Sequence, residues 1–298
     1  MTVAQSLAPV LVLAACLGCS ASKAVDTERI DLCDYEIAFA DEFDTLAVAP
    51  RKIEGGARWT AHTPWNGDFG DARFSDPRPD WPFTLAGGVL RITARRDEKG
   101  RWRSGLIAAA DASGAGNGVQ YGYFEARMKL PPGPGTWPAF WLMSLQPASQ
   151  LPKIEIDAIE YYGHMTDKYF ATGHVWYGGK NKHLTRHEGT KLPVPAGSLT
   201  DDFHRYGVRV DAQFITYFLD GKAMWRQPTP KEHKAPLYPL VNLALGSGYP
   251  IAQTPDPSVL EIDYVRVYRP VTGRGEANCA GAAESQGRLS PQPADKRP

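Results

Sequence analysis

Alternating apolar and polar residues dominate the chain between residues 35 and 270, as in half-buried β-strands. Turns rich in glycine, proline and aspartate separate these segments, and none of them shows a convincing helical period. Asp220-Gly221 is a strong hairpin signal. We therefore predict an all-β fold with few helices, a β-sandwich of two curved antiparallel sheets built from a dozen or so strands. The clearest expected strand segments are 35–44, 87–96, 121–130, 135–145, 153–163, 169–177, 206–227, 240–246 and 260–270.

One segment, KIEIDAIEYYG at 153–163, does not fit simple alternation. In a regular strand Glu160 would lie among isoleucines, where an unpaired carboxylate costs several kcal/mol. One extra residue, a β-bulge at Ala158-Ile159, removes the conflict and leaves the isoleucines on the core face. The bulge would also curve the sheet into a groove. The polar face would then carry Glu155, Asp157, Glu160 and Tyr162.

The paired carboxylates of this face suit glycoside hydrolysis. Glu155 and Glu160 lie about 13 Å apart at their Cα atoms, and side chains leaning together could close most of that gap. Retaining glycosidases need carboxyl groups ~5–5.5 Å apart and inverting ones ~6.5–9.5 Å, so the spacing permits the retaining geometry. The alternative is an acidic, solvated strand face. A similar EID at 261–263 has Arg266 where a third acid would be needed, and we interpret that strand as structural.

Two tryptophans strengthen the case for a sugar-binding groove. Trp137 and Trp141 are four residues apart in WPAFW, so an extended strand points both to the same face. Indole rings stack on the C–H faces of sugars while acids meet the hydroxyl groups. The alternative is a pair of core tryptophans.

The segment YGYFEARMKLPPGPGTWPAFWLM, followed by EIDAIE, resembles glycoside hydrolase family 16 in its bulged form. The similarity extends to FADEFD, FHRYGVRV…LDG and LVNLALG…IDYVRVY, and covers roughly residues 35 to 270. It implies a β-jelly-roll with a concave substrate cleft and retaining hydrolysis of a β-linked polysaccharide, such as a β-1,3-glucan, an agar or a carrageenan. A transglycosylase with the same residues and a non-catalytic carbohydrate-binding jelly roll remain as alternatives.

The resemblance also implies roles for individual residues. Glu155 is the expected nucleophile, Asp157 its electrostatic helper and Glu160 the general acid/base. Glu160 must then hold a proton near neutral pH, although a free glutamate titrates at ~4.3. We expect the two nearby anions, Glu155 and Asp157, to raise the pKa of Glu160.

Further cleft residues are expected on three segments. Trp137, Trp141 and His174 match family positions that line the cleft, although a lone histidine is otherwise more often structural. The segment 62–77 matches no family signature, and we expect it to form a cleft loop, with a surface Ω-loop as the alternative. The loop residues that we expect at the cleft are Trp65, Asn66, Asp68 and Arg73.

The expected reaction requires no cofactor. Some family members carry a structural calcium on the convex side, and Glu42, the Gly88 carbonyl and Asp263 lie in roughly the right segments. The chain has 33 Lys+Arg and 33 Asp+Glu, so it shows no charge pattern for nucleic acid. A polysaccharide is the expected partner, and we expect a monomer.

The N-terminus predicts export. Residues 1–24 contain an apolar stretch too short to span a bilayer, followed by small residues, although no Lys or Arg precedes it. Leu13-Ala14-Ala15-Cys16 resembles a bacterial lipoprotein cleavage box, which would lipidate Cys16. The alternatives are ordinary cleavage near Ala21 to Ala24 and an unprocessed N-terminus. We expect an extracellular, periplasmic or outer-membrane-anchored protein whose only membrane contact is a lipid.

The remaining boundaries follow from composition. We expect the catalytic domain to cover residues 28–272 and the segment 273–298, poor in apolar residues, to be a disordered tail. Cys33 and Cys279 lie near opposite ends of the mature domain, and an oxidising environment would allow them to form a disulfide. Two free thiols are the alternative.

Overall fold

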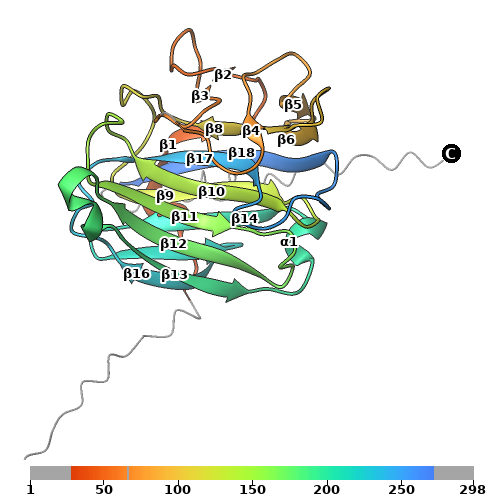
Figure 1. Ribbon diagram of the computed structural model, residues 1–298. Helices are drawn as coiled ribbons and strands as arrows, with labels where there is room; N and C mark the ends of the chain where they lie inside the picture. Colours follow the sequence, from red (N-terminus) through yellow and green to blue (C-terminus); the bar gives the residue numbers. More distant parts are fainter. Residues whose placement is uncertain (1–27, 66, 272–298) are drawn as a thin grey trace, which may run out of the picture.

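The computed structural model describes residues 28–65 and 67–271, which form two stacked β-sheets (Figure 1). One sheet has ten strands in the order β16-β15-β14-β9-β18-β6-β7-β4, with β1 beside β18 and β5 beside β6. Its strands are β1 (Tyr35–Asp41), β4 (Arg73–Phe74), β5 (Phe83–Ala86), β6 (Val89–Arg96), β7 (Trp102–Ser104), β9 (Gly122–Lys129), β14 (His204–Val210), β15 (Phe214–Leu219), β16 (Lys222–Pro228) and β18 (Ser258–Pro270).

The second sheet has eight strands in the order β13-β12-β11-β10-β17-β8-β3-β2. Figure 1 shows β10 to β13 side by side across it. Its strands are β2 (Val48–Ala49), β3 (Trp59–Thr60), β8 (Leu106–Ala108), β10 (Thr136–Ser144), β11 (Lys153–Glu160), β12 (Lys168–Trp176), β13 (Arg186–Pro193) and β17 (Leu237–Leu245).

Helices are few, as predicted. The described residues contain two 3₁₀ turns, η1 (Leu32–Asp34) and η2 (Gly179–Leu184), and one short helix, α1 (Ser198–Asp201). No helix within residues 28–65 and 67–271 has the length and apolar character needed to cross a membrane.

Every strand segment expected from the sequence is present, and the all-β sandwich is confirmed. The sheets are not purely antiparallel, because the two short pairs β2–β3 and β4–β7 are parallel. Seven strands were not predicted. Six have only two to four residues, and the longer β13 is an exposed edge strand with the sequence RHEGTKLP, which has no apolar alternation.

The core lies between the two sheets and fixes which face of β10 and β11 is free for function. Ile154, Ile156 and Ile159 of β11 are at most 1% exposed, as are Phe140 and Leu142 of β10. Burying one such side chain stabilises the fold by roughly 1.5–3 kcal/mol. Because the isoleucines hold one face of β11 in the core, the acidic residues must occupy the other.

The predicted bulge in β11 is confirmed. Between Asp157 and Glu160 the chain advances three residues along β11 but only two along β12. The pairing with β10 also passes directly from Asp157 to Ile159, leaving Ala158 without a partner position. The extra residue therefore sits at Ala158-Ile159 and returns Glu160 to the acidic face.

Several predictions fall on the ends of the chain. The export signal, Cys16 and the tail after residue 272 lie outside the described residues. Cys33 is disulfide-bonded. Its predicted partner Cys279 also lies outside the described residues, so the pairing stays a prediction.

Candidate active site

The acidic face of β11 is the floor of a cleft with a volume of about 150 Å³. β10 contributes the neighbouring wall through residues at every second position, as expected for an extended strand. The segment before β4 contributes two aromatic side chains, and β17 contributes one amide. The lining residues are Trp65, Phe69, Trp137, Ala139, Trp141, Glu155, Asp157, Glu160 and Asn242.

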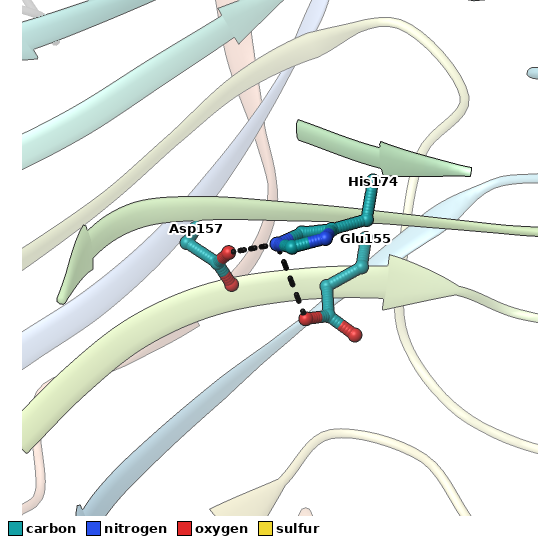
Figure 2. Close-up of side chains that lie close together, drawn as sticks. All are labelled: Glu155, Asp157 and His174. Atoms are coloured by element: carbon teal, nitrogen blue, oxygen red, sulfur yellow. Dashed lines mark hydrogen bonds and ion pairs between the residues drawn. The ribbon is translucent and has the colours of Figure 1, made fainter. Parts of the chain in front are cut away.

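Glu155 and Asp157 converge on a histidine from the next strand (Figure 2). His174 is the register partner of Glu155 across the β11–β12 ladder. Its Nε2 lies 3.0 Å from Asp157 Oδ2 and 3.9 Å from Glu155 Oε1. The Trp176 indole, stacked on the His174 ring, donates a hydrogen bond of 3.0 Å to Glu155 Oε2. His174, which was predicted to line the cleft, therefore contacts two of the acids directly.

Glu160 has a separate set of partners on the other side of the bulge. Trp137 Nε1 donates to Glu160 Oε1 at 3.1 Å, and the Tyr162 hydroxyl reaches the same oxygen at 3.4 Å. The rings of Trp137 and Tyr162 stack with centroids 6.1 Å apart. Trp137 is therefore more than an apolar platform, because its N–H also orients a carboxylate.

Burial raises the pKa of all three carboxyl groups. The pKa of Glu155 rises to about 8, first through burial and then through the charge of Asp157. The pKa of Asp157 also rises, through burial and the charge of Glu160. The predicted rise in the pKa of Glu160 is confirmed in direction, but its largest cause is burial rather than the neighbouring anions. The cleft therefore retains protons that solvated carboxylates would lose.

Two residues of the segment 62–77, Trp65 and Phe69, line this cleft, as expected of a cleft loop. Trp65 and Phe69 pack edge-on against Trp141, with centroids 5.9 and 6.0 Å away. Trp141 is consequently only 5% exposed, and its Nε1 donates to Asn242 Oδ1 at 2.8 Å. Little of the Trp141 ring is left open to a sugar.

Two other expected loop residues, Asp68 and Arg73, do not line the cleft. Asp68 accepts a hydrogen bond of 2.9 Å from His62, which raises the pKa of His62. Arg73 lies on β4 and lines a neighbouring hollow. Asn66 lies outside the described residues.

Three side chains at the site were missed from the sequence: two line the cleft and one is bonded to Glu155. Trp176 could have been found, because it lies two residues after His174 and so shares its face. Asn242 is a single polar residue in the apolar run LVNLALG, which was a weaker signal. Phe69 carried no signal, since its position depends on how the loop folds back.

One group of side chains could hold a metal ion. Ligand atoms of Glu155, Asp157 and His174 lie within 4.8 Å of one another, and no other such group was found among the described residues. Two of the residues considered for calcium have arginine partners in the structure. Both carboxylate oxygens of Glu42 accept hydrogen bonds of 2.8 Å from the Arg266 guanidinium group. Asp263 forms an ion pair of 2.7 Å with Arg127.

A jelly roll with three carboxylates on a bulged strand, flanked by indoles in a cleft, defines the site of a carbohydrate-active enzyme. Residues 106–266 match the family model of the glycosyl hydrolases family 16. The chain belongs to this family.

Two curated relatives and one solved structure illustrate the similarity. The endo-1,3-1,4-beta-glycanase ExsH of Rhizobium meliloti is 30% identical to this chain over 77% of the chain's length. The matched region covers only 51% of the length of ExsH. A beta-glucanase of Rhodothermus marinus is 29% identical, covering 86% of this chain and 92% of the relative. The laminarinase structure from Rhodothermus marinus superposes with a TM-score of 0.60 at 27% identity, covering 80% of this chain and 98% of that one.

Proposed function

We propose that the protein is a retaining endo-β-glycosidase that hydrolyses internal linkages of a β-glucan. The observation that carries this proposal is the placement of Glu155, Asp157 and Glu160 on one face of the bulged β11, in a cleft flanked by Trp137. Membership of family 16 and the similarity to a beta-glucanase and an endo-1,3-1,4-beta-glycanase support the reaction and the substrate class.

In the first step, the Glu155 carboxylate attacks the anomeric carbon while protonated Glu160 gives its proton to the leaving glycosidic oxygen. The C–O bond to the leaving sugar breaks as the bond to Glu155 forms. Glu155 must be ionised to attack. The charge of His174 and the Trp176 N–H both lower its pKa, against the rise caused by burial and by the charge of Asp157. Asp157, held by His174, modulates the charge of Glu155.

In the second step, Glu160 acts as a base. Once Glu155 is esterified it carries no charge, so the pKa of Glu160 should fall. Glu160 then takes a proton from a water molecule, whose oxygen attacks the anomeric carbon and frees Glu155. An acceptor sugar in place of water would give transglycosylation by the same residues, and product analysis distinguishes the two.

Chemical rescue tests the roles of the two glutamates. With an activated aryl glycoside and azide, Glu155→Ala should yield an inverted glycosyl azide and Glu160→Ala a retained one. Glu261→Ala on β18 is the matched control and should behave as the wild type. Swapped products would reverse the roles, and full activity in either cleft variant would reject them.

A panel of β-glucans, agars and carrageenans tests the substrate class. We expect β-1,3-glucan or mixed-linkage β-glucan to be cleaved to oligosaccharides. Binding to a glucan without cleavage of any polymer would indicate a non-catalytic carbohydrate-binding protein.

We propose that no cofactor is needed, because the two carboxyl groups supply the nucleophile and the proton. Treatment with EDTA should leave both the rate of glucan hydrolysis and the Tm unchanged. A Tm that falls with EDTA and returns with Ca²⁺ would instead reveal a structural calcium.

We propose that the protein is exported, as an acylated lipoprotein or as a secreted monomer. The apolar N-terminal stretch and the Leu13-Ala14-Ala15-Cys16 sequence support this proposal. Mass spectrometry of the protein from its native host should find Cys16 with acyl chains at the N-terminus. An intact Met1 would contradict export, and an N-terminus near Ala21 to Ala24 would replace lipidation with ordinary cleavage.

A further inference from the structure

His62 bridges two aspartates of the segment 62–77, which we call the cleft segment. Its Nδ1 lies 2.9 Å from Asp68 Oδ2, and its Nε2 lies 3.1 Å from Asp76 Oδ1. His62 is only 6% exposed, so little water can replace either partner. A neutral imidazole has one N–H and one lone pair, whereas an imidazolium donates from both nitrogens. The geometry therefore matches the protonated ring, which can donate to both carboxylates at once.

The two ends of this bridge are held by different sheets. His62 directly follows β3 of the eight-stranded sheet, where the Thr60 hydroxyl donates to the Ala110 carbonyl at 2.8 Å. Asp76 follows β4 of the ten-stranded sheet by two residues. The His62 ring therefore joins the two sheets through Asp76. Through Asp68 it also ties the middle of the cleft segment to this joint.

Phe69, the residue after Asp68, connects the bridge to the cleft. The Phe69 ring packs edge-on against Trp137 and Trp141, with centroids 5.3 and 6.0 Å away. Trp137 in turn donates a hydrogen bond to Glu160. A shift of Asp68 would therefore reach the cleft wall beside the expected acid/base.

We propose that His62 is a positioning residue for glucan hydrolysis, because its imidazolium holds Asp68 and thereby fixes Phe69 in the cleft wall. This inference rests on the proposed function, since it concerns the same substrate in the same cleft. Loss of the proton places a nitrogen lone pair against one carboxylate, so the neutral ring keeps only one of its two partners. The Asp71 N–H still donates to the Leu245 carbonyl at 2.8 Å, so the cleft segment shifts at Phe69 without unfolding.

The charges around His62 set the pH range of this change. The charged groups that face the ring are Asp68, Asp76 and Arg51. The hydrogen bond to Asp68 raises the pKa of His62 above its ordinary value of 6.5, while burial and the charge of Arg51 oppose the rise. A raised pKa in the fold means that the contribution of the bridge is complete below pH 6.5 and is lost as the pH rises through the folded-state pKa.

Asp76→Asn tests the proposal while keeping His62. The new amide can donate to Nε2 while the neutral ring donates from Nδ1 to Asp68, so both contacts survive without the extra proton. The Asp76 side chain is 61% exposed, so the fold should tolerate the change. Asp220→Asn is the matched control, because it makes the same change beside His204 on β14, whose Nδ1 lies 2.7 Å from Asp220 Oδ2.

Calorimetry with a β-1,3-gluco-oligosaccharide measures binding in a Glu155→Gln background, in which cleavage is stopped. At about pH 9 we expect the background protein to bind roughly threefold to tenfold more weakly than the one that also carries Asp76→Asn, because it has lost a charge-assisted hydrogen bond. At about pH 6 the two should bind equally. Asp220→Asn should follow the background protein at both pH values. The proposal is overturned if Asp76→Asn gives no advantage at pH 9, or if Asp220→Asn gives the same one.

Near-ultraviolet circular dichroism separates this inference from the proposed function, because it reports the packing of Trp137 and Trp141 without a substrate. A spectral change between pH 6 and 9 that Asp76→Asn abolishes, in a protein that neither binds nor cleaves glucan, would reject the glucanase assignment and support the role of His62 in fixing the cleft wall. If β-glucan is cleaved but the spectra and affinities of Asp76→Asn follow the wild type, the role of His62 fails alone.

Discussion

Strands β11 and β18 both contain Glu-Ile-Asp, and both have an irregular register, yet their acids are in different electrostatic states. Exposure does not separate them, because the side chain of Asp263 is 14% exposed and that of Glu155 18%. Their partners do. On β18, Glu261 pairs with Arg91 at 2.9 Å and Asp263 with Arg127 at 2.7 Å.

The acids of β11 have no such cations. Among the described residues, Glu155, Asp157 and Glu160 pair with neither lysine nor arginine, and their partners are indole N–H groups, a tyrosine hydroxyl and His174. A carboxylate neutralised by arginine from an adjacent strand contributes to sheet pairing. Burial among other acids instead raises the pKa of a carboxyl group, which is a property typical of a functional site.

Removing one carboxyl group from each strand should have very different effects on activity. We expect Glu155→Gln to lower kcat/KM on β-glucan by at least about 10³-fold, because an amide cannot form the covalent intermediate. Glu261→Gln should stay within about twofold of the wild type, since Glu261 only pairs with Arg91. Reducing-end assays measure both. More than a tenth of wild-type activity in Glu155→Gln would contradict the contrast.

The same substitution should change how stability depends on pH. The pKa of Glu155 is about 8 in the fold against 4.5 as a free group. The folded state therefore binds more protons than the unfolded state between these values, and the stability that protonated Glu155 contributes is lost as the pH rises from 4.5 to 8. Glu155→Gln should be more stable than the wild type at pH 8 by roughly 2–4 kcal/mol, with the difference vanishing near pH 4.

Thermal unfolding of both proteins over this pH range measures the difference. Comparing variant with wild type cancels the contributions of histidines elsewhere in the fold. A difference that stays constant between pH 4.5 and 8 would show that Glu155 does not have a raised pKa. Asp263→Asn provides the opposite control, because it breaks an ion pair and should lower the Tm at neutral pH.

The two indoles that contact the β11 acids should shift different limbs of the pH–rate profile. Trp176 donates to Glu155, and Trp137 donates to Glu160; both bonds lower the pKa of the carboxyl group that accepts them. Trp176→Phe should therefore move the acidic limb of kcat/KM to higher pH, and Trp137→Phe should move the basic limb to higher pH. Equal shifts of both limbs in either variant would mean that the indoles do not act on separate acids.

Much of β10 and β11 could be predicted from the sequence, because their patterns obey local rules. The cost of burying Glu160 required a bulge, and the spacing of Trp137 and Trp141 required a shared face. The partners of the acids could not be predicted in the same way. That Trp176 reaches Glu155 depends on the register between β11 and β12. That burial is the largest cause of the raised pKa of Glu160 depends on how its surroundings pack in the folded protein.

The two acids considered for calcium, one just after β1 and one on β18, show the same limit. Glu42 and Asp263 lie in suitable segments, but each is paired with an arginine from a distant part of the sequence. Arg266 binds Glu42 at a separation of 224 residues, and Arg127 binds Asp263 at a separation of 136. Only the folded chain brings these cations to the acids. The sequence alone therefore does not show that Glu42 and Asp263 are paired with arginines.

The smallest expected effects lie within β18 itself. The Arg127–Asp263 pair is mostly buried, with side chains 19% and 14% exposed, whereas in the Arg91–Glu261 pair they are 45% and 24% exposed. Water screens the second pair more strongly, so Glu261→Gln should lower the free energy of unfolding by under about 0.5 kcal/mol. Asp263→Asn should lower it by about 1–2 kcal/mol, because it leaves Arg127 without a charge partner. Urea unfolding of the two variants measures the costs, and both should hydrolyse β-glucan at wild-type rates. Equal costs would mean that screening does not distinguish the pairs. A loss of activity in either folded variant would mean that the acids of β18 contribute to the reaction as those of β11 do.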